Sequence, residues 1–290
     1  MNLLATNRRV VPIDEPGIGY HLGLFVADVM GAHPATFEES RLLLPAARAD
    51  DRQYFFSKDY EHIWRPRLRM LILTRFHAQM RDRATEKGMK HPVAVIKEPA
   101  GSQVAEFIFS LLPASRLLFL VRDPRDVLDS TLDAVLGGSW LANQFGSSGQ
   151  LSREERLVFL RAQAHRWLAR TEVVQRVYDR LPADQRYLVR YEDLRADPST
   201  VVRDVLRWLR LDVDEARLAT AVEQLSFEAL PDSVRGQGKF ARAATPGLWR
   251  ENLTAEEQTL IHETIGDALV KLGYEIGYPG SHELGSRDHR

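Results

Sequence analysis

Two short apolar runs in the middle of the chain constrain its fold more than any other feature. VAVIK occupies residues 93–97 and RLLFLV occupies residues 116–121. Each run is followed by a segment in which apolar residues recur with helical spacing, at residues 100–112 and 127–136. Runs of this length predict buried strands. The order strand, helix, strand, helix predicts parallel strands with helices on both faces.

The rest of the chain extends this pattern. RYLVR at residues 186–190 predicts a third strand, and it follows a long helix predicted over residues 153–181. Ser102 and Asp123 are expected N-caps, and Thr254 begins an expected capping box. Further helices are predicted within residues 54–87 and over residues 198–211, 215–225 and 255–272. The sum is an α/β fold of three layers, with a central parallel sheet flanked by helices.

Length and composition narrow the class of protein. With 290 residues there is room for one large domain or two small ones, and no linker or repeat divides the chain. We expect one domain over residues 1–277 and a mobile tail over residues 278–290. Thirty-nine Lys and Arg residues against forty Asp and Glu residues leave a net charge of −1, which disfavours general binding of nucleic acid.

Several further classes are disfavoured by what the sequence lacks. It contains no cysteine, so disulfides and Cys-based metal sites are excluded, and no other metal-ligand pattern is present. No segment approaches the roughly 18 apolar residues of a membrane span, and the N-terminus does not read as a signal peptide. The sequence therefore predicts a soluble, cytoplasmic protein without a metal.

The end of the second predicted strand carries the first motif with chemical meaning. The strand leads into RDPRD, in which Arg122 lies at the strand end and Asp123 begins a helix. Ligands of open parallel sheets bind at the carboxyl ends of the strands, so Arg122 faces the expected place of an anion. Ser130 lies about two helical turns further on. An alternative interpretation pairs Arg122 with Asp126 and leaves Ser130 as a neutral surface residue.

The longer segment FLVRDPRDVLDS resembles the 3′-phosphate-binding segment of the sulfotransferases that use 3′-phosphoadenosine 5′-phosphosulfate (PAPS). In that family an apolar strand runs into Arg-[Asn/Asp]-Pro-[Arg/Lys]-Asp-x-x-x-Ser, and its first Arg and its Ser contact the 3′-phosphate. The resemblance places these roles on Arg122 and Ser130. It implies a P-loop-like sulfotransferase fold.

Two later segments agree with the resemblance and occur in the expected order. VRYEDL at residues 189–194 resembles the family's Tyr-Glu-Asp-Leu segment, which implies that Tyr191 lies near the adenine. A tyrosine after a strand offers a flat face for a purine, although a core tyrosine is the alternative. RAATPGLWR at residues 242–250 resembles the closing loop of the family, Arg-Lys-Gly-x-x-Gly-x-Trp-Lys. The match carries phosphate contact to Arg242 and places Gly247 and Trp249 in the cofactor site.

The closing loop also departs from the family pattern. Ala243 and Ala244 replace the Lys and Gly that follow the family's Arg, which weakens this half of the phosphate site. Arg235 and Lys239, in the Gly-rich run before the loop, are candidates to compensate. The alternative interpretation of the whole segment is a mobile basic loop.

The glycine-rich loop that holds the 5′-phosphosulfate in this family is not recognisable here. Gly17-Ile-Gly19 is the only early G-x-G; we expect no strand to lead into it, and no Lys-Thr follows. Residues 2–11 resemble the end of the helix that normally follows the loop. The sequence therefore predicts an N-terminally truncated member of the fold, whose opening strand and loop belong upstream of Met1, and weak or absent activity of the chain as given.

Two segments offer catalytic groups. PIDEP followed by GIGYHL resembles the region of Golgi-type sulfotransferases in which a Glu acts as base, so Glu15 is the first candidate and Asp14 the second. A solvated turn is the alternative. Lys97-Glu98-Pro99 stands where cytosolic members carry Lys-Thr-His-x-Pro. Lys97 is therefore expected to stabilise charge near the sulfonate, without the family's His. His21 is a further candidate.

The resemblance implies transfer of a sulfuryl group from PAPS to a hydroxyl or amine of a small-molecule, glycan or peptide acceptor. A non-catalytic binding module of the same fold is the alternative, because the phosphate loop is missing. A P-loop kinase is disfavoured, since no Gly-Lys-Ser/Thr is present. Residues 20–64 and 137–150 are expected to line the acceptor site. The acceptor's identity and the oligomeric state are not readable.

Overall fold

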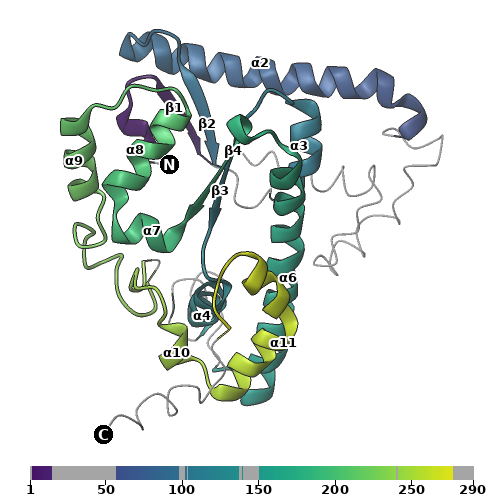
Figure 1. The fold of residues 1–290 in the computed structure, drawn as a ribbon, viewed down its shortest axis with the longest axis vertical. Coiled ribbons are helices and arrows are strands. Elements are labelled where there is room, and N and C mark those ends of the chain that lie inside the picture. Colours follow the sequence, from purple (N-terminus) through teal and green to yellow (C-terminus); the bar gives the residue numbers. More distant parts are fainter. Residues whose placement is uncertain are drawn as a thin grey trace, which may run out of the picture. The chain divides into compact units, whose positions relative to one another are not determined.

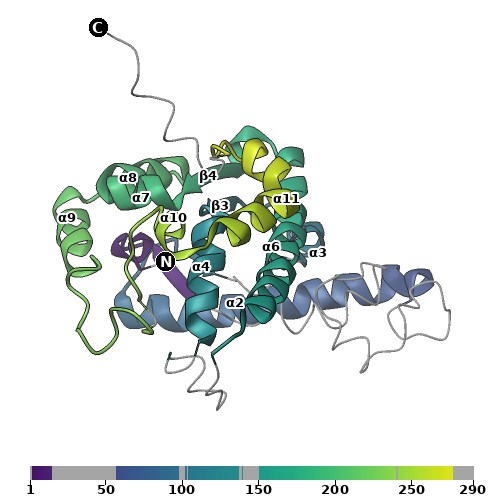
Figure 2. The same ribbon diagram turned by 90° about the horizontal axis from the view of Figure 1, so that it is seen from below.

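The computed structural model describes residues 2–14, 57–97, 102, 104–136, 139, 150–239 and 241–276. Its internal contacts divide the chain into two compact units, which are described separately (Figures 1 and 2). Unit 1 consists of Met1–Leu120 and Ala169–Ser226, and unit 2 consists of Val121–Leu168 and Phe227–Arg290. The single domain expected over residues 1–277 stays a prediction.

The three predicted strands all form. β2 (Val93–Lys97) and β4 (Arg186–Arg190) have the expected bounds, and β3 (Leu117–Val121) begins one residue later than expected. β3 pairs with β4, and β2 pairs in parallel with a strand that was not expected, β1 (Val10–Asp14). The described strands thus form two two-stranded sheets of an α/β fold.

β1 corrects the interpretation of the N-terminus. Residues 2–11 were expected to end a helix, but only a 3₁₀ turn, η1 (Leu4–Thr6), precedes a strand. The physical reason is that the β-branched side chains of Val10 and Val11 are almost fully buried in the sheet, at 1% and 0% exposure. β1 ends three residues before Gly17, so the expectation that no strand leads into Gly17-Ile-Gly19 is wrong. The absence of a strand before these glycines therefore no longer supports the predicted truncation. Residues 15–56, which contain the glycines, lie outside the described residues.

β1 also places a helical layer on each of its faces. Val10 belongs to an apolar cluster with Val202 and Leu206 of α8, whereas Ile13 belongs to a second cluster with Phe76 of α2 and other apolar residues of α2 and α3. Because alternate side chains of a strand point to opposite faces, the two clusters lie on opposite sides of the sheet. This is the layered arrangement that the sequence predicts.

The helices predicted in unit 1 form close to their expected positions, with a difference at the start of α3. Val104, with no side-chain capping bond, precedes α3, so the predicted N-cap at Ser102 is wrong and the helix is shorter than expected. Elsewhere the expected helices form within a few residues of their predicted bounds. The elements are η3 (Lys58–Tyr60), α2 (Glu61–Lys87), α3 (Ala105–Leu111), η5 (Ala183–Gln185), α7 (Tyr191–Ala196), α8 (Pro198–Trp208) and α9 (Glu215–Gln224).

Unit 2 is helical, and charged side chains lie in its interior. It contains α4 (Pro124–Val135), the first part of α6 (Arg153–Arg180), α10 (Trp249–Asn252) and α11 (Ala255–Lys271). The predicted cap of α4 and the predicted capping box of α11 both form. The buried charged or polar residues of this unit are Asp123, Arg125, Asp126, Asp129, Ser139, Glu257 and His262. Among the described helices of the chain, none is long and apolar enough to cross a membrane.

Candidate functional site

One face of α4 is acidic and binds the closing loop. Asp126, Asp129 and Asp133 are spaced by three and four residues, which places them on one face of a helix. Each of the three carboxylates accepts a hydrogen bond from the segment between Gly238 and Asn252. We call these three residues the acidic face of α4.

Asp126 holds the backbone of the closing loop. Its carboxylate accepts hydrogen bonds from the backbone N–H groups of Gly247, at 2.7 Å, and Trp249, at 3.3 Å. Burial raises the pKa of Asp126, and these two hydrogen bonds and the charge of Arg122 oppose the rise. Gly247 has a φ of +88°, and a Cβ atom there would lie 2.8 Å from Nη1 of Arg250, so this turn requires glycine.

Asp129 holds the first cation of the closing loop. Its Oδ2 atom accepts hydrogen bonds from the Arg242 guanidinium and, at 3.0 Å, from Nδ2 of Asn252. The side chains of Arg242 and Asp129 are only 14% and 4% exposed. The hydrogen bond to Asp129 is the main cause that raises the pKa of Arg242, and the charges of Asp133 and Asp126 add to it. Arg242 is therefore tied to α4 through Asp129.

Trp249 packs inside unit 2. Cζ of Arg125 lies 4.1 Å from the centre of its indole ring, and the His262 ring meets it edge-on at 6.0 Å. Arg125 also donates to both carboxylate oxygens of Asp123 and, at 2.8 Å, to the carbonyl oxygen of Glu275. Burial, and then the charge of Arg125, lower the pKa of His262. A ring that is 1% exposed anchors the loop, so its contact with a nucleotide stays a prediction.

The structure brings the three predicted phosphate-binding residues to α4. Arg122 follows β3 directly, Ser130 lies on α4, and Arg242 is bonded to α4 through Asp129. The side chains of Arg122 and Ser130 are both half-buried. Ala244, which replaces the family's Gly, keeps a left-handed backbone with a φ of +52°. The loop thus retains a conformation suited to glycine in spite of the substitution.

The predicted catalytic residues lie in unit 1. Asp14 and Lys97 are partners in the register of β1 and β2, at the carboxyl ends of two parallel strands. Lys97 is exposed, and Glu15 lies outside the described residues. Tyr191 is half-buried and begins α7 directly after β4, as expected for a residue at a strand end.

The sequence analysis missed the residues that position the loop. Asp129 and Asn252 were not singled out, and Asp126 appeared only as an alternative partner of Arg122. The signal that would have revealed the face is the acidic spacing of three and four residues along α4, next to the recognised motif. Arg235 is bonded locally, because its Nε atom donates to Asp232 at 2.8 Å, and its suggested compensating role stays a prediction.

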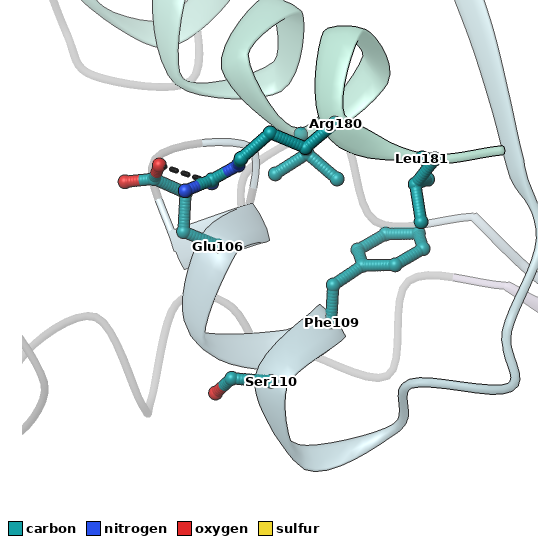
Figure 3. A pocket seen from close by; sticks show the side chains of 6 residues that line it. Glu106, Phe109, Ser110, Arg180 and Leu181 are labelled. Atoms are coloured by element: carbon teal, nitrogen blue, oxygen red, sulfur yellow. Dashed lines mark hydrogen bonds and ion pairs between the residues drawn. The ribbon is translucent and has the colours of Figure 1, made fainter.

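A cavity of about 380 Å³ lies elsewhere, between α3 and the end of α6 (Figure 3). Its charged residues neutralise each other: Glu106 pairs with Arg180 and Arg176. Burial alone would raise the pKa of Glu106, but the two arginines hold it below its usual range. None of the predicted site residues lines this cavity. Among the described residues, no cluster of His, Asp and Glu is suited to a metal ion.

Comparisons with known proteins identify the family of the chain. A family model described as "Sulfotransferase family" matches residues 24–215, about two thirds of the chain. The chain therefore belongs to the sulfotransferase family, whose chemistry is sulfuryl transfer. The match includes Lys97, Arg122, Ser130 and Tyr191 and ends before the closing loop. No curated protein sequence matches the chain significantly.

Solved structures of sulfotransferase-related proteins resemble the chain at low sequence identity. Retinol dehydratase in complex with androsterone and the inactive cofactor PAP is 16% identical, covering 96% of this chain and 85% of that one, with a TM-score of 0.39. The sulfotransferase domain from the curacin biosynthetic pathway is 13% identical, covering 92% and 98%, with a TM-score of 0.39. A retinol dehydratase complex with retinol and PAP is 17% identical, covering 94% and 84%, with a TM-score of 0.37.

Proposed function

We propose that the protein transfers the sulfuryl group of PAPS to a hydroxyl or amine of an acceptor, releasing 3′-phosphoadenosine 5′-phosphate (PAP). The observation that carries the proposal is the gathering of Arg122, Ser130 and Arg242 along α4, in a chain of the sulfotransferase family. Two guanidinium groups and a hydroxyl are donors that suit a phosphate group. The acceptor is a small molecule, a glycan or a peptide.

The donor set fits the nucleotide. Arg122 and Arg242 supply positive charge, because guanidinium groups are always protonated, and Ser130 supplies a hydroxyl donor on α4. The start of α4 adds backbone N–H groups and the positive end of its dipole, both of which favour an anion. Tyr191 offers its ring to the adenine. When bound, PAPS supplies the sulfuryl group that is transferred.

Asp14, Glu15 and Lys97 serve the acceptor in this proposal. A carboxylate of Asp14 or Glu15 takes the proton of the attacking hydroxyl or amine. The Lys97 ammonium donates to the oxygen that gains negative charge as the sulfuryl group leaves. The parallel register supports a joint role, because it sets Asp14 and Lys97 on neighbouring strands, which lie about 4.8 Å apart.

Calorimetric titration with PAP and a turnover assay test the two halves of the site. Arg122→Ala is expected to weaken PAP binding by at least about tenfold, because it removes a charge-assisted contact. Glu15→Ala and Asp14→Asn are expected to leave PAP affinity unchanged and to lower turnover, and Lys97→Ala is expected to lower turnover. Val158→Ala, an exposed position on α6, serves as the control. Unchanged PAP affinity in Arg122→Ala would overturn the site assignment.

One observation favours a second candidate, a binding module without catalysis. The sequence that follows β1 is EPGIGYH, which has glycines but neither the basic residue nor the Thr pair of the family's phosphate loop. A radiolabelled PAPS assay with a panel of hydroxyl and amine acceptors separates the candidates. PAP binding without any sulfated product would favour the module, and a labelled product would favour the enzyme.

A further inference from the structure

The Arg242 guanidinium is held by a carboxylate that is itself tied down. Asp129 is buried on α4, and its Oδ2 atom accepts from both Arg242 and Asn252. Removing one partner of a buried ion pair leaves an uncompensated charge, which is costly. The Arg242 side chain is therefore fixed at this point of α4.

Arg242 retains donors for a second anion. A guanidinium offers five N–H donors in a planar fork, and Nη2 is the atom that donates to Asp129. Among the described residues, the hydrogen bond to Asp129 is the only one recorded for the Arg242 side chain. Its other nitrogen atoms are thus available to a ligand.

Asp129, which holds Arg242, lies in sequence between the two other predicted phosphate-binding residues. Ser130 is the next residue of α4, and Arg122 directly precedes Asp123, the N-cap of the same helix. The two residues after Arg242 are alanines, so this part of the loop brings no second cation. The orientation of the Arg242 guanidinium consequently determines which contact this part of the loop makes with a phosphate group.

We propose that Asp129 is a positioning residue, which holds Arg242 on α4 so that Arg242 and Arg122 bind the same phosphate group. This inference rests on the proposed function and assigns the group to the 3′-phosphate of the donor nucleotide. Asp129 acts through Arg242 and does not touch the nucleotide. Its effect is therefore confined to ligands that carry the 3′-phosphate.

Two nucleotides that differ in that phosphate provide the test. PAP carries the 3′-phosphate and adenosine 5′-monophosphate (AMP) does not. Asp129→Asn is expected to weaken PAP binding about tenfold, because the charged hold on Arg242 is lost, and to leave AMP binding unchanged. In an Arg242→Gln background, Asp129→Asn is expected to cause no further loss of PAP affinity. Asp184→Asn, the same charge change at an exposed carboxylate in η5, is the control.

The outcomes separate the inference from the proposed function. Unchanged PAP affinity in Asp129→Asn, an equal loss for PAP and AMP, or losses that add in the double variant would each overturn the inference. Absence of PAP binding by the unaltered protein would overturn the proposed function and the inference together. If Asp129→Asn does not fold, Asn252→Ala replaces it. This exposed change is expected to weaken PAP binding about threefold and AMP binding not at all, and equal effects would overturn the inference.

Discussion

Two helices of this protein begin with the same local signal and then differ in what they bury. α4 and α8 both start with Asp-Pro, and in both the Asp side chain caps the helix. Asp123 accepts from the backbone N–H of Arg125 at 2.9 Å, and Asp197 accepts from that of Thr200 at 3.0 Å. The cap therefore determines where each helix begins but not what its faces contact.

The two helices diverge after the cap. α8 buries Val202, Val205 and Leu206 in an apolar cluster, as an amphipathic helix does. α4 buries leucines too, but also the charged side chains of Arg125, Asp126 and Asp129. Buried charges are retained only with partners, and these come from Asp123 and from the C-terminal segment between Arg242 and Glu275. The difference teaches that α8 serves stability, whereas α4 also serves as an anchor for a site.

The largest effect is expected from Arg125→Ala. The substitution leaves the Asp123 carboxylate buried without its main partner and should lower the free energy of unfolding by about 3–5 kcal/mol. Ser199 occupies the corresponding position in α8, and Ser199→Ala should change it by less than about 0.5 kcal/mol. Urea unfolding measures both. Similar values for the two variants would remove the contrast between the helices.

Leu206→Ala on α8 should be next in size. It removes a side chain that is 1% exposed and leaves a cavity, at a cost of about 3 kcal/mol. Because α8 carries no predicted ligand residue, PAP affinity of the folded protein should stay unchanged. Urea unfolding and calorimetry check the two quantities. A parallel loss of PAP affinity would show that α8 is not a purely structural helix.

Asp126→Ala on α4 should cost less stability but affect binding. It deprives the backbone N–H groups of Gly247 and Trp249 of their acceptor, at about 2 kcal/mol. Because the closing loop carries Arg242, PAP affinity should fall as well. A variant that loses stability while binding PAP normally would show that Asp126 does not hold the loop for binding.

Acidification should change the stability contributions of one aspartate in each helix in opposite directions. Hydrogen bonds to Thr200 hold the pKa of Asp197 below its usual range, so its contribution to stability is present above the ordinary Asp pKa and is lost as pH falls through the lower folded value. Burial raises the pKa of Asp126, so the folded state binds a proton there at a higher pH than the unfolded state does. Protonation of Asp126 on acidification therefore favours the folded state.

Unfolding measured at neutral pH and at about pH 3, below the ordinary Asp pKa, tests this sign. The loss of stability on acidification should be smaller in Asp197→Asn than in the unaltered protein, and larger in Asp126→Asn. Shifts in the same direction for both variants would contradict the assignment of either pKa.

The smallest effects are expected at two left-handed residues. Arg210, after α8, and Ala244, in the loop that α4 anchors, have φ values of +59° and +52°. Glycine adopts this conformation without the Cβ clash, so Arg210→Gly and Ala244→Gly should each raise the free energy of unfolding by up to about 1 kcal/mol, and with it the melting temperature. Gly247→Ala is the opposite change in the same loop and should lower it. A lower melting temperature in Ala244→Gly would contradict the strain argument.

Local patterns predicted much of the fold. The apolar runs that became β2, β3 and β4, the cap of α4 and the capping box of α11 were all readable, because each depends on residues close in sequence. β1 was missed because it contains Pro12, which reads against a strand, and because its partner β2 lies about 80 residues later. Its valines become strand residues only through burial against other elements.

The candidate site also combines local features, which the sequence predicts, with long-range contacts, which it does not. The sequence by itself determined that Arg122 and Ser130 lie at a strand end and on the helix that follows, since strand, turn and helix are local features. Only the tertiary structure decided that Asp129 meets Arg242, 113 residues away, that Asp14 lies opposite Lys97, and that the Trp249 ring is buried. Such contacts depend on which elements pack together, and no local propensity encodes which distant partner a buried carboxylate will find.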